Sequence, residues 1–308
     1  MDFLKFLEGL RTPFGDTFFS LITHLGEETI FIVVGLLFFW CINKKQGYYI
    51  LSVGFLGTVI NQFLKLFFRI PRPWVQDPEF TIVESARAEA TGYSFPSGHT
   101  QSAVGVFGSI ARISKNTLIR ILCIASCILV PISRMYLGVH TPADVGVSFI
   151  IAVILIFVLY PVVNKATDDP KRMRIFLACM TAIAGAFLVY VLVTPFPADM
   201  DSYNLEHGMK NAYKIFGCIL GLWVAYEADT GYTHFDTHAI WWAQILKLVL
   251  GLLLVLGIKA GFKPILNTLL GGNYLADGIR YFLLVIFAGC LWPLTFRFWG
   301  KLGNPSRK

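Results

Sequence analysis

Residues 141–164 read TPADVGVSFIIAVILIFVLYPVVN and decide the fold, because Asp144 is the one charged side chain in the stretch. A membrane-spanning helix needs about 20 predominantly apolar residues in a row, which this stretch provides. On either side of it, further spans are predicted at residues 29–43, 48–70, 98–113, 117–137, 174–194, 210–227, 238–257 and 281–299. The chain is therefore predicted to be all-α, a polytopic transmembrane helical bundle.

The composition of the whole chain supports this assignment. Of 308 residues, 56% are hydrophobic and 15% are charged, which leaves too little polar surface to cover a soluble protein of this size. The net charge of +7 arises from Lys and Arg residues in short connections, with no contiguous basic stripe. We therefore predict a membrane protein with basic loops and no nucleic-acid partner.

The first 28 residues have a different pattern. Apolar side chains recur every three or four residues in 2–11 and again in 14–25, and charged side chains occupy the opposite face of the first run. Neither run approaches the length of a spanning helix. Residues 1–28 are predicted to form amphipathic helices at the membrane interface, with a short first span as the alternative.

Basic residues indicate which connections face the cytoplasm. Three short connections are basic, through Lys44, Lys45, Arg112, Lys115, Arg120, Lys165, Lys171, Arg172 and Arg174. The segments 71–97, 138–141 and 195–209 are then predicted to face outward. Three groups of polar residues lie at this outward face, which predicts a site on the extracytoplasmic side of the cell membrane.

The first group consists of two cations near the end of a predicted span. Lys65 and Arg72 are seven residues apart, which is about 10 Å along one helix face. Pro71 and Pro73 predict that the helix ends near Ile70, so that Lys65 lies more than one turn inside the span. Because charge at this depth is costly, an anion site is favoured over Lys65 reaching the interface and Arg72 contacting lipid headgroups.

The second group is Pro96-Ser97-Gly98-His99, where the next span begins. A helix N-terminus presents unpaired backbone N–H groups and a positive dipole end, and glycine lets an anion approach the chain. Ser97 and Gly98 are therefore candidates for anion binding. The alternative is that Ser97 only caps the helix and His99 is a polar residue in its first turn.

The third group contains Arg134, His140 and Asp144. Asp144 follows His140 by four residues, so its carboxylate can accept a hydrogen bond from one imidazole nitrogen. Such a bond would fix the tautomer, leave the other nitrogen as a nucleophile and stabilise the cation formed on attack. Asp144 is also well placed to cap the helix beginning at Thr141-Pro142, but capping leaves His140 and Arg134 unexplained.

Together the three groups carry a family resemblance. They resemble the three-part signature of the type 2 phosphatidic acid phosphatase (PAP2) superfamily, and of its bacterial membrane lipid phosphatases in particular, in the order Lys65-x6-Arg72-Pro73, Pro96-Ser97-Gly98-His99 and Ser133-Arg134-x5-His140-x3-Asp144. The resemblance covers about residues 15–165. It implies a PAP2-like catalytic transmembrane core at residues 29–165, followed by additional C-terminal transmembrane helices at 166–308.

The resemblance also implies a metal-independent reaction without a cofactor. His140 would attack phosphorus to form a phosphohistidine, with Asp144 orienting the ring. His99 would protonate the leaving oxygen and then activate water. The phosphate oxygens would be held by Lys65, Arg72, Ser97, Gly98 and Arg134. Three fixed cations would supply the charge stabilisation on which phosphoryl transfer depends.

The predicted function is that of a membrane lipid phosphatase acting on a lipid phosphomonoester or diphosphate within the bilayer. Its rivals are a lipid phosphotransferase, a vanadium haloperoxidase and, in a different class, a transporter or channel whose charges line a path. The spanning helices argue against a haloperoxidase, because the family's haloperoxidases are soluble. A transporter is disfavoured because the charged residues gather at one face of the membrane and the sequence has no inverted repeat. A noncatalytic scaffold is disfavoured because every signature position is filled.

Two further polar clusters receive weaker interpretations. Glu227, Asp229, His234, Asp236 and His238 surround a Gly-Tyr turn and include metal-ligand types. The predicted topology places them on the cytoplasmic side, so a solvated loop with helix caps is favoured. His24, beside Gly26 and Glu27, is assigned to an interfacial polar face in preference to the mouth of the site.

Overall fold

The computed structural model describes residues 1–197 and 200–302, and these residues form helices and no strands. The chain begins with α1 (Asp2–Gly9), α2 (Pro13–Thr23), a 3₁₀ turn (His24–Gly26), α3 (Glu28–Leu37) and a π-helical turn (Phe38–Ile42). It continues with α4 (Lys44–Phe68), α5 (Pro73–Gln76), a 3₁₀ turn (Glu84–Ala86), α6 (Gly98–Ile113), α7 (Thr117–Tyr136) and α8 (Pro142–Thr167). The predicted all-α class is confirmed.

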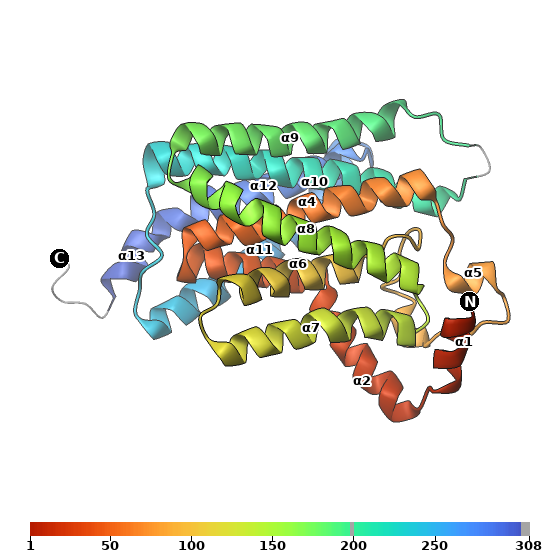
Figure 1. Ribbon diagram of the computed structural model, residues 1–308. Helices are drawn as coiled ribbons and strands as arrows, with labels where there is room; N and C mark the ends of the chain where they lie inside the picture. Colours follow the sequence, from red (N-terminus) through yellow and green to blue (C-terminus); the bar gives the residue numbers. More distant parts are fainter. Residues whose placement is uncertain (198–199, 303–308) are drawn as a thin grey trace. The chain divides into compact units, whose positions relative to one another are not determined.

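The rest of the chain is also helical (Figure 1). It comprises α9 (Pro170–Val193), α10 (Ser202–Ala228), α11 (Trp241–Leu269), α12 (Leu275–Ile286) and α13 (Phe296–Lys301). Short π-helical turns follow α10 at Asp229–Thr233 and α12 at Phe287–Leu291, and a 3₁₀ turn precedes α13 at Trp292–Thr295.

Several of these helices are long and apolar enough to cross a membrane. Among the described residues, six helical segments qualify: Lys44–Gln76, Thr117–Tyr136, Pro142–Thr167, Pro170–Val193, Trp241–Leu269 and Leu275–Lys301. A seventh results if Pro13–Gly26 and Glu28–Ile42, which are bent by 50°, form one broken span. The chain is therefore a multi-pass membrane protein. The interfacial placement of residues 1–28 stays a prediction beside this alternative.

α6 has the predicted bounds, 98–113, but its 16 residues, or about 24 Å, are too short for it to count among these candidate spans. Buried side chains such as Ala103 and Val104 make it an inner helix. α10 begins at Ser202, well before the predicted start at residue 210, and its first turns carry Glu206 and Lys210. Hydrophobic runs therefore located both helices, but they did not predict the polar first turns of α10.

The chain divides into two compact units. The first comprises Met1–Ile32, Ser52–Tyr160 and Pro195–Gly208, and the second comprises Val33–Leu51, Pro161–Thr194 and Met209–Lys308. Every residue of the predicted phosphate site belongs to the first unit. The predicted division into 1–28, 29–165 and 166–308 stays a prediction.

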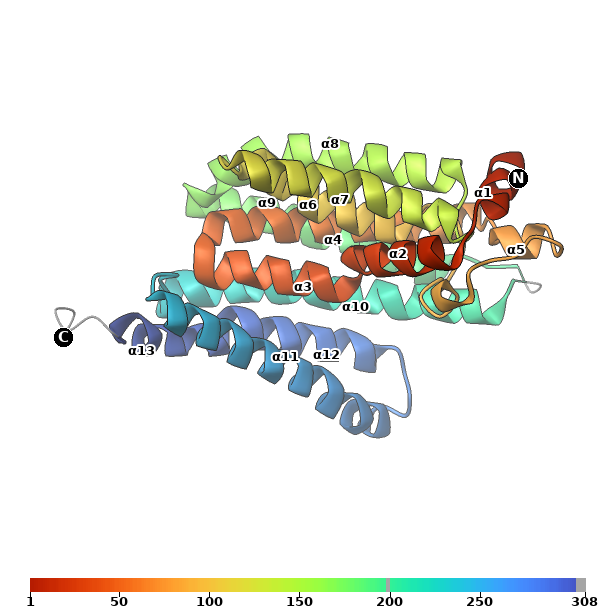
Figure 2. The same ribbon diagram turned by 90° about the horizontal axis from the view of Figure 1, so that it is seen from below.

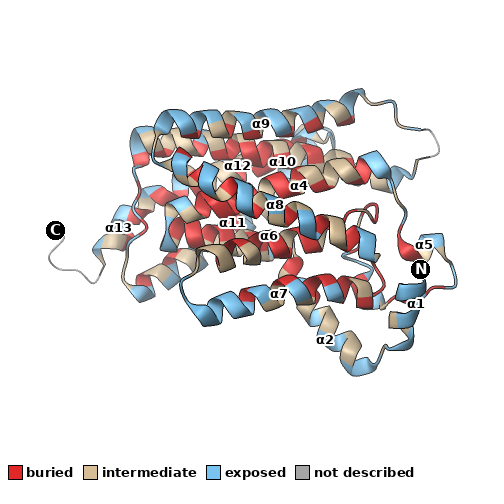
Figure 3. Cartoon of the chain, viewed as in Figure 1, coloured by how far each residue is buried: buried red, intermediate tan, exposed pale blue. Residues whose placement is uncertain are grey.

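Within the first unit, α6 and α7 run side by side in opposite directions (Figure 1), and α2 lies against α7 (Figure 2). One face of α7 exposes Leu118, Ile121 and Ile128, whereas Val130 and Arg134 are buried (Figure 3). An exposed apolar face is what lipid contact requires. The polar end of α7 is therefore turned into the unit, and its apolar face is turned outward.

Candidate active site

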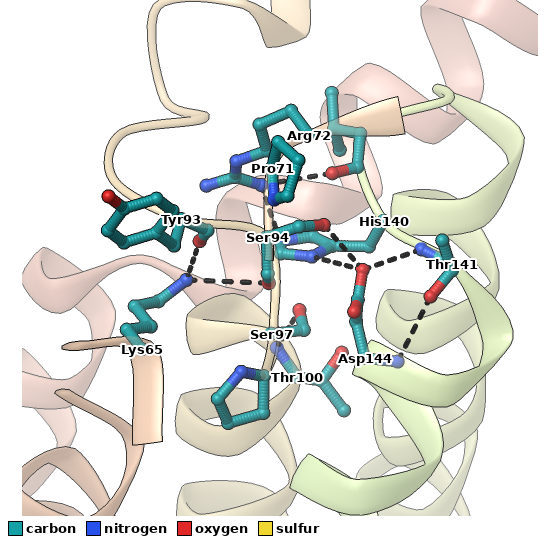
Figure 4. A network of polar contacts seen from close by, with 12 residues as sticks. Lys65, Pro71, Arg72, Tyr93, Ser94, Ser97, Thr100, His140, Thr141 and Asp144 are labelled. Carbon is teal, nitrogen blue, oxygen red and sulfur yellow. Dashed lines mark hydrogen bonds and ion pairs between the residues drawn. The ribbon is translucent and has the colours of Figure 1, made fainter. Parts of the chain in front are cut away.

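The three polar groups predicted from the sequence meet at one end of the first unit (Figure 4). Lys65 lies in the last turn of α4 and Arg72 immediately precedes α5. The loop 93–97 leads into α6, Arg134 lies in the last turn of α7, and His140 precedes α8. Helix ends thus bring side chains from distant parts of the chain into one network of polar contacts.

Asp144 binds the ring of His140, as the four-residue spacing predicted. His140 Nδ1 lies 3.4 Å from Asp144 Oδ2. The same oxygen accepts hydrogen bonds from the Ser94 hydroxyl at 2.5 Å and from the Thr141 amide at 2.8 Å. Both interpretations of Asp144 are therefore realised, because one carboxylate oxygen caps α8 and faces the imidazole.

The other imidazole nitrogen faces a cation. Arg72 Nη1 lies 3.0 Å from His140 Nε2. A guanidinium can only donate, so this contact requires the lone pair to be on Nε2 and the proton to be on Nδ1. The hydrogen bonds on both sides of the ring therefore favour the tautomer with the proton on Nδ1 and the lone pair on Nε2.

The guanidinium of Arg72 is held by backbone carbonyls. Its Nε donates to Gly92 O at 3.0 Å, Nη1 to Val139 O at 3.0 Å and Nη2 to Thr91 O at 2.6 Å. Arg72 is 6% exposed. Carbonyl oxygens satisfy the donors without neutralising the charge, so a full positive charge is kept next to His140 Nε2.

Lys65 is fixed by the same loop. Its Nζ donates to the Tyr93 carbonyl and lies 3.5 Å from the Ser94 carbonyl. α4 ends at Phe68 and Arg69 adopts a left-handed conformation with φ of 52°, close to the end predicted from the prolines. Lys65 is therefore buried one turn inside α4, and in the described part of the chain its Nζ contacts backbone carbonyls and no carboxylate.

The start of α6 supplies the second group of residues. Ser97 is the N-cap, and its hydroxyl accepts from the Thr100 amide at 3.4 Å, so the capping interpretation of Ser97 is realised. The Ser97 amide donates to the Asp144 carbonyl at 3.0 Å, which joins the starts of α6 and α8. Gly98 is the first helical residue, and His99 follows with a buried Nε2 that has no hydrogen-bond partner in the described part of the chain.

Arg134 is the third buried cation. It is fully buried, and its Nη1 donates to the Thr23 hydroxyl at 2.7 Å. Within the described residues, its Nε and Nη2 have no hydrogen-bond partner. Two adjacent donors of a buried guanidinium are thus available for a planar or tetrahedral anion.

The surroundings of His140 favour its neutral form. His140 lies in the connection between α7 and α8, outside the spanning helices. Burial and the positive charges of Arg72, Arg134 and Lys65 hold the pKa of His140 well below its ordinary value. A neutral imidazole is the form that can attack phosphorus.

Sequence reasoning missed three contributors to this arrangement. Ser94 binds Asp144, Asn61 Nδ2 donates to the Pro96 carbonyl at 3.3 Å, and Thr23 binds Arg134. Ser94 was visible only as part of an aromatic loop, and Asn61 only as an isolated polar residue in a span. Thr23 gave no signal, because α2 was interpreted as an interfacial helix.

The second polar cluster lies in the second unit and consists of hydrogen bonds and ion pairs within that unit. Asp229 accepts from the Thr233 hydroxyl at 2.7 Å and the Phe235 amide at 3.0 Å. Glu227 pairs with Arg174 at 2.9 Å, and Asp236 Oδ1 lies 2.6 Å from His238 Nδ1. Over the described ranges, no group of three or more His, Cys, Asp or Glu residues is placed to hold a metal ion.

The fold and the site together place the chain in a class of proteins: multi-pass helical membrane proteins with a buried histidine among fixed cations. Comparison with known families agrees with the predicted resemblance. Residues 45–168 match the PAP2 superfamily model, and residues 213–304 match the model of the transmembrane extension of PAP2 superfamily phosphatases. The chain belongs to the PAP2 superfamily.

Individual relatives are lipid phosphatases from bacteria and eukaryotes. The undecaprenyl-diphosphatase BcrC of Bacillus subtilis is 34% identical over 118 residues, covering 38% of this chain and 58% of the relative. The sphingosine-1-phosphate phosphatase 1 of Mus musculus is 25% identical over 271 residues, covering 80% and 59%. The phosphatidylglycerophosphatase B of Bacillus subtilis is 29% identical over 181 residues, covering 54% and 81%.

The first two of these alignments span less than two thirds of the relative. No solved structure matches the chain.

Proposed function

We propose that the chain is a metal-independent lipid phosphatase of the cell membrane, which hydrolyses a lipid phosphomonoester or diphosphate at the extracytoplasmic face. In the first step His140 Nε2 attacks phosphorus, the bond from phosphorus to the lipid oxygen breaks, and His99 donates a proton to that oxygen. In the second step His99 removes a proton from water, which attacks phosphorus, releases phosphate and regenerates His140.

The observation that carries this proposal is the contact between Arg72 Nη1 and His140 Nε2 at 3.0 Å. A phosphate attacked by this nitrogen takes over the hydrogen bond from Arg72, so it lies beside a buried guanidinium that makes no ion pair with a carboxylate in the described part of the chain. Phosphoryl transfer depends on charge stabilisation around phosphorus more than on covalent help from the protein. Arg72 is therefore placed where negative charge develops.

The other predicted residues fit the same proposal. The free donors of Arg134 and the unpartnered Nε2 of His99 suit a phosphate oxygen and a leaving oxygen. Lys65 adds a third cation, and the amide of Gly98 lies at the start of α6, where an anion is favoured. Asp144 orients His140 and stabilises the imidazolium formed on attack.

The extracytoplasmic placement is supported by charge in the connections. Basic residues flank the short connections on the opposite side of the spans from segments 71–97 and 138–141. A site at the headgroup level can accept a lipid that stays in the bilayer. Right-side-out vesicles should therefore hydrolyse an added short-chain lipid phosphate that cannot cross the membrane, without permeabilisation.

The test is phosphate release by the purified full-length protein in detergent. Phosphatidate, phosphatidylglycerol phosphate, sphingosine phosphate and undecaprenyl diphosphate should be offered side by side, each with EDTA present. We expect phosphate release from at least one lipid, inhibition by orthovanadate, and loss of turnover in His140→Ala by about 10³-fold or more. The control is His238→Ala, because the ring of this exposed histidine pairs with Asp236 in the second unit, away from the proposed site residues in the first.

Three outcomes would contradict the proposal: full turnover in His140→Ala, activity abolished by EDTA, or label from the lipid recovered in a second lipid in place of inorganic phosphate. The last outcome would identify a phosphotransferase.

A further inference from the structure

The N-terminal helix α2 contacts the proposed site although it lies outside the matched family segment, which begins at residue 45. α2 and the following turn, His24–Gly26, belong to the first unit and pack against α7 and α6. Phe14 and Leu21 are exposed on one face of α2, whereas Thr23 is buried. The face of α2 that carries Thr23 is thus directed into the unit.

The contact with the site is a single buried hydrogen bond. Thr23 Oγ1 accepts from Arg134 Nη1 at 2.7 Å, and the two residues are 4% and 0% exposed. In the described part of the chain, the Nε and Nη2 atoms of Arg134 have no hydrogen-bond partner, so the bond from Nη1 to Thr23 holds the guanidinium. A guanidinium is planar, so one fixed Nη sets the direction of the remaining donors.

A second set of contacts holds α2 in place on α7. The Thr12 amide donates to the Tyr136 hydroxyl at 3.0 Å, and Arg11 Nε donates to the Tyr136 carbonyl at 3.0 Å. The close approach needs glycine at position 15, because a Cβ there would lie 2.3 Å from the Tyr136 hydroxyl. α2 is therefore anchored two residues from Arg134 and cannot easily slide.

The turn after α2 also touches the site. A Cβ added at Gly26 would lie 2.7 Å from the His99 carbonyl oxygen and 2.9 Å from the His99 Cβ. The end of α2 and the turn that follows therefore contact both Arg134 and His99.

We infer that Thr23 is a positioning residue for phosphate binding: its hydroxyl orients Arg134 so that Nε and Nη2 face the phosphate oxygens. This inference rests on the proposed function. The N-terminal segment thereby completes an anion site whose other members lie in the three signature groups.

The test compares three variants of the full-length protein that differ by single side-chain groups. Thr23→Val replaces the hydroxyl by a methyl group of similar size, and Thr23→Ser keeps the hydroxyl. Thr17→Val makes the same change in the same helix. Within the described residues, the Thr17 hydroxyl donates only to the Pro13 carbonyl, at 2.9 Å. Measurements are kcat/KM on phosphatidate in mixed micelles and the inhibition constant of orthovanadate.

We expect Thr23→Val to lower kcat/KM and to raise the vanadate inhibition constant by a similar factor, about 10- to 100-fold, as for a lost hydrogen bond to a charged group. Thr23→Ser should stay within about threefold of wild type, and Thr17→Val should match wild type. In an Arg134→Ala background Thr23→Val should add no further loss, because Thr23 acts through Arg134.

A general loss of folding would lower activity without changing the vanadate inhibition constant of the remaining active protein, and that result would overturn the inference. Equal behaviour of Thr23→Val and Thr17→Val would overturn it too, as would additive losses in the Arg134→Ala background. Failure of the proposed function is distinguishable, because wild type itself would then release no phosphate.

Discussion

Asp144 accepts three hydrogen bonds at one carboxylate oxygen, and its two tasks can be separated by mutation. The bond from the Thr141 amide caps α8, whereas the contact with His140 serves the proposed reaction. An asparagine keeps an acceptor oxygen for the cap but carries no negative charge.

We therefore expect Asp144→Asn to fold and to lose about 10²- to 10⁴-fold in kcat, the range for removing the charge behind a catalytic histidine. The control is Asp169→Asn, because the Asp169 carboxylate also accepts a capping hydrogen bond, as the N-cap of α9, from the Lys171 amide at 2.9 Å. Steady-state kinetics and the thermal unfolding midpoint in detergent would be compared. Equal losses of kcat in the two variants would show that capping alone explains Asp144.

The low pKa of His140 has a consequence for the pH dependence. Burial and three neighbouring cations disfavour the protonated ring, so the neutral nucleophile persists when the pH falls below the ordinary histidine value near 6.5. Once corrected for ionisation of the substrate, the acidic limb of the kcat/KM profile, where protonation removes the nucleophile, should therefore lie below pH 6.5. Histidine side-chain NMR of the labelled protein gives the same pKa without substrate. A midpoint at or above 6.5 would contradict the environment seen here.

The predictability of the site at this scale depended on local spacing. His140 and Asp144 are four residues apart, so the sequence indicated their contact directly. Ser94 and Asp144 are 50 residues apart, and the Arg134–Thr23 bond joins residues 111 apart. No helical spacing rule reaches such pairs, because only the packing of whole helices brings them together.

At the scale of elements, the helix ends matter most. Prolines and polar residues marked where α4 stops and where α6 and α8 start, and the structure has these ends within a few residues of the prediction. The orientation of α2 was not predictable in the same way. Its apolar residues, such as the exposed Phe14 and Leu21, predict an amphipathic helix. This pattern does not indicate that Thr23 at the end of the helix is buried against the site.

The turn after α2 offers a test of this packing. Gly26→Ala places a methyl group within 3 Å of His99 atoms, so we expect a loss of about 1–3 kcal/mol in the free energy of unfolding and a lower kcat because His99 moves. The control is Gly9→Ala in α1, where an added Cβ meets nothing within 4 Å. Thermal unfolding and kcat would be measured for both. Wild-type behaviour of Gly26→Ala would show that the turn does not constrain His99.

At the scale of the whole molecule, the site residues belong to one unit and the second polar cluster belongs to the other. Substitutions in the second cluster should therefore change the stability of the protein and leave the proposed activity unchanged. In the second unit, Lys44 lies 2.6 Å from Asp229 Oδ2 and its Nζ lies 3.6 Å from the centre of the Phe235 ring.

We expect Asp229→Ala to lower the free energy of unfolding by about 2 kcal/mol, because Lys44 and two hydrogen-bond donors lose a partly buried acceptor. The kcat of the folded protein should stay unchanged. Asp168→Ala is the matched control, since Asp168 pairs with the adjacent Lys45 at an exposed position, where ion pairs contribute little. A large loss of kcat in Asp229→Ala at a temperature where it is folded would link this cluster to the chemistry.

Covalent transfer of phosphate through His140 can be tested most directly by trapping the intermediate. Lipid phosphate labelled in the phosphoryl group would be mixed with wild type, with His99→Ala to slow the attack of water, and with His140→Ala, and then quenched in alkaline detergent. We predict label on wild type and more label on His99→Ala, lost on acid treatment, and none on His140→Ala. Label or undiminished turnover in His140→Ala would contradict the role of this histidine as the nucleophile.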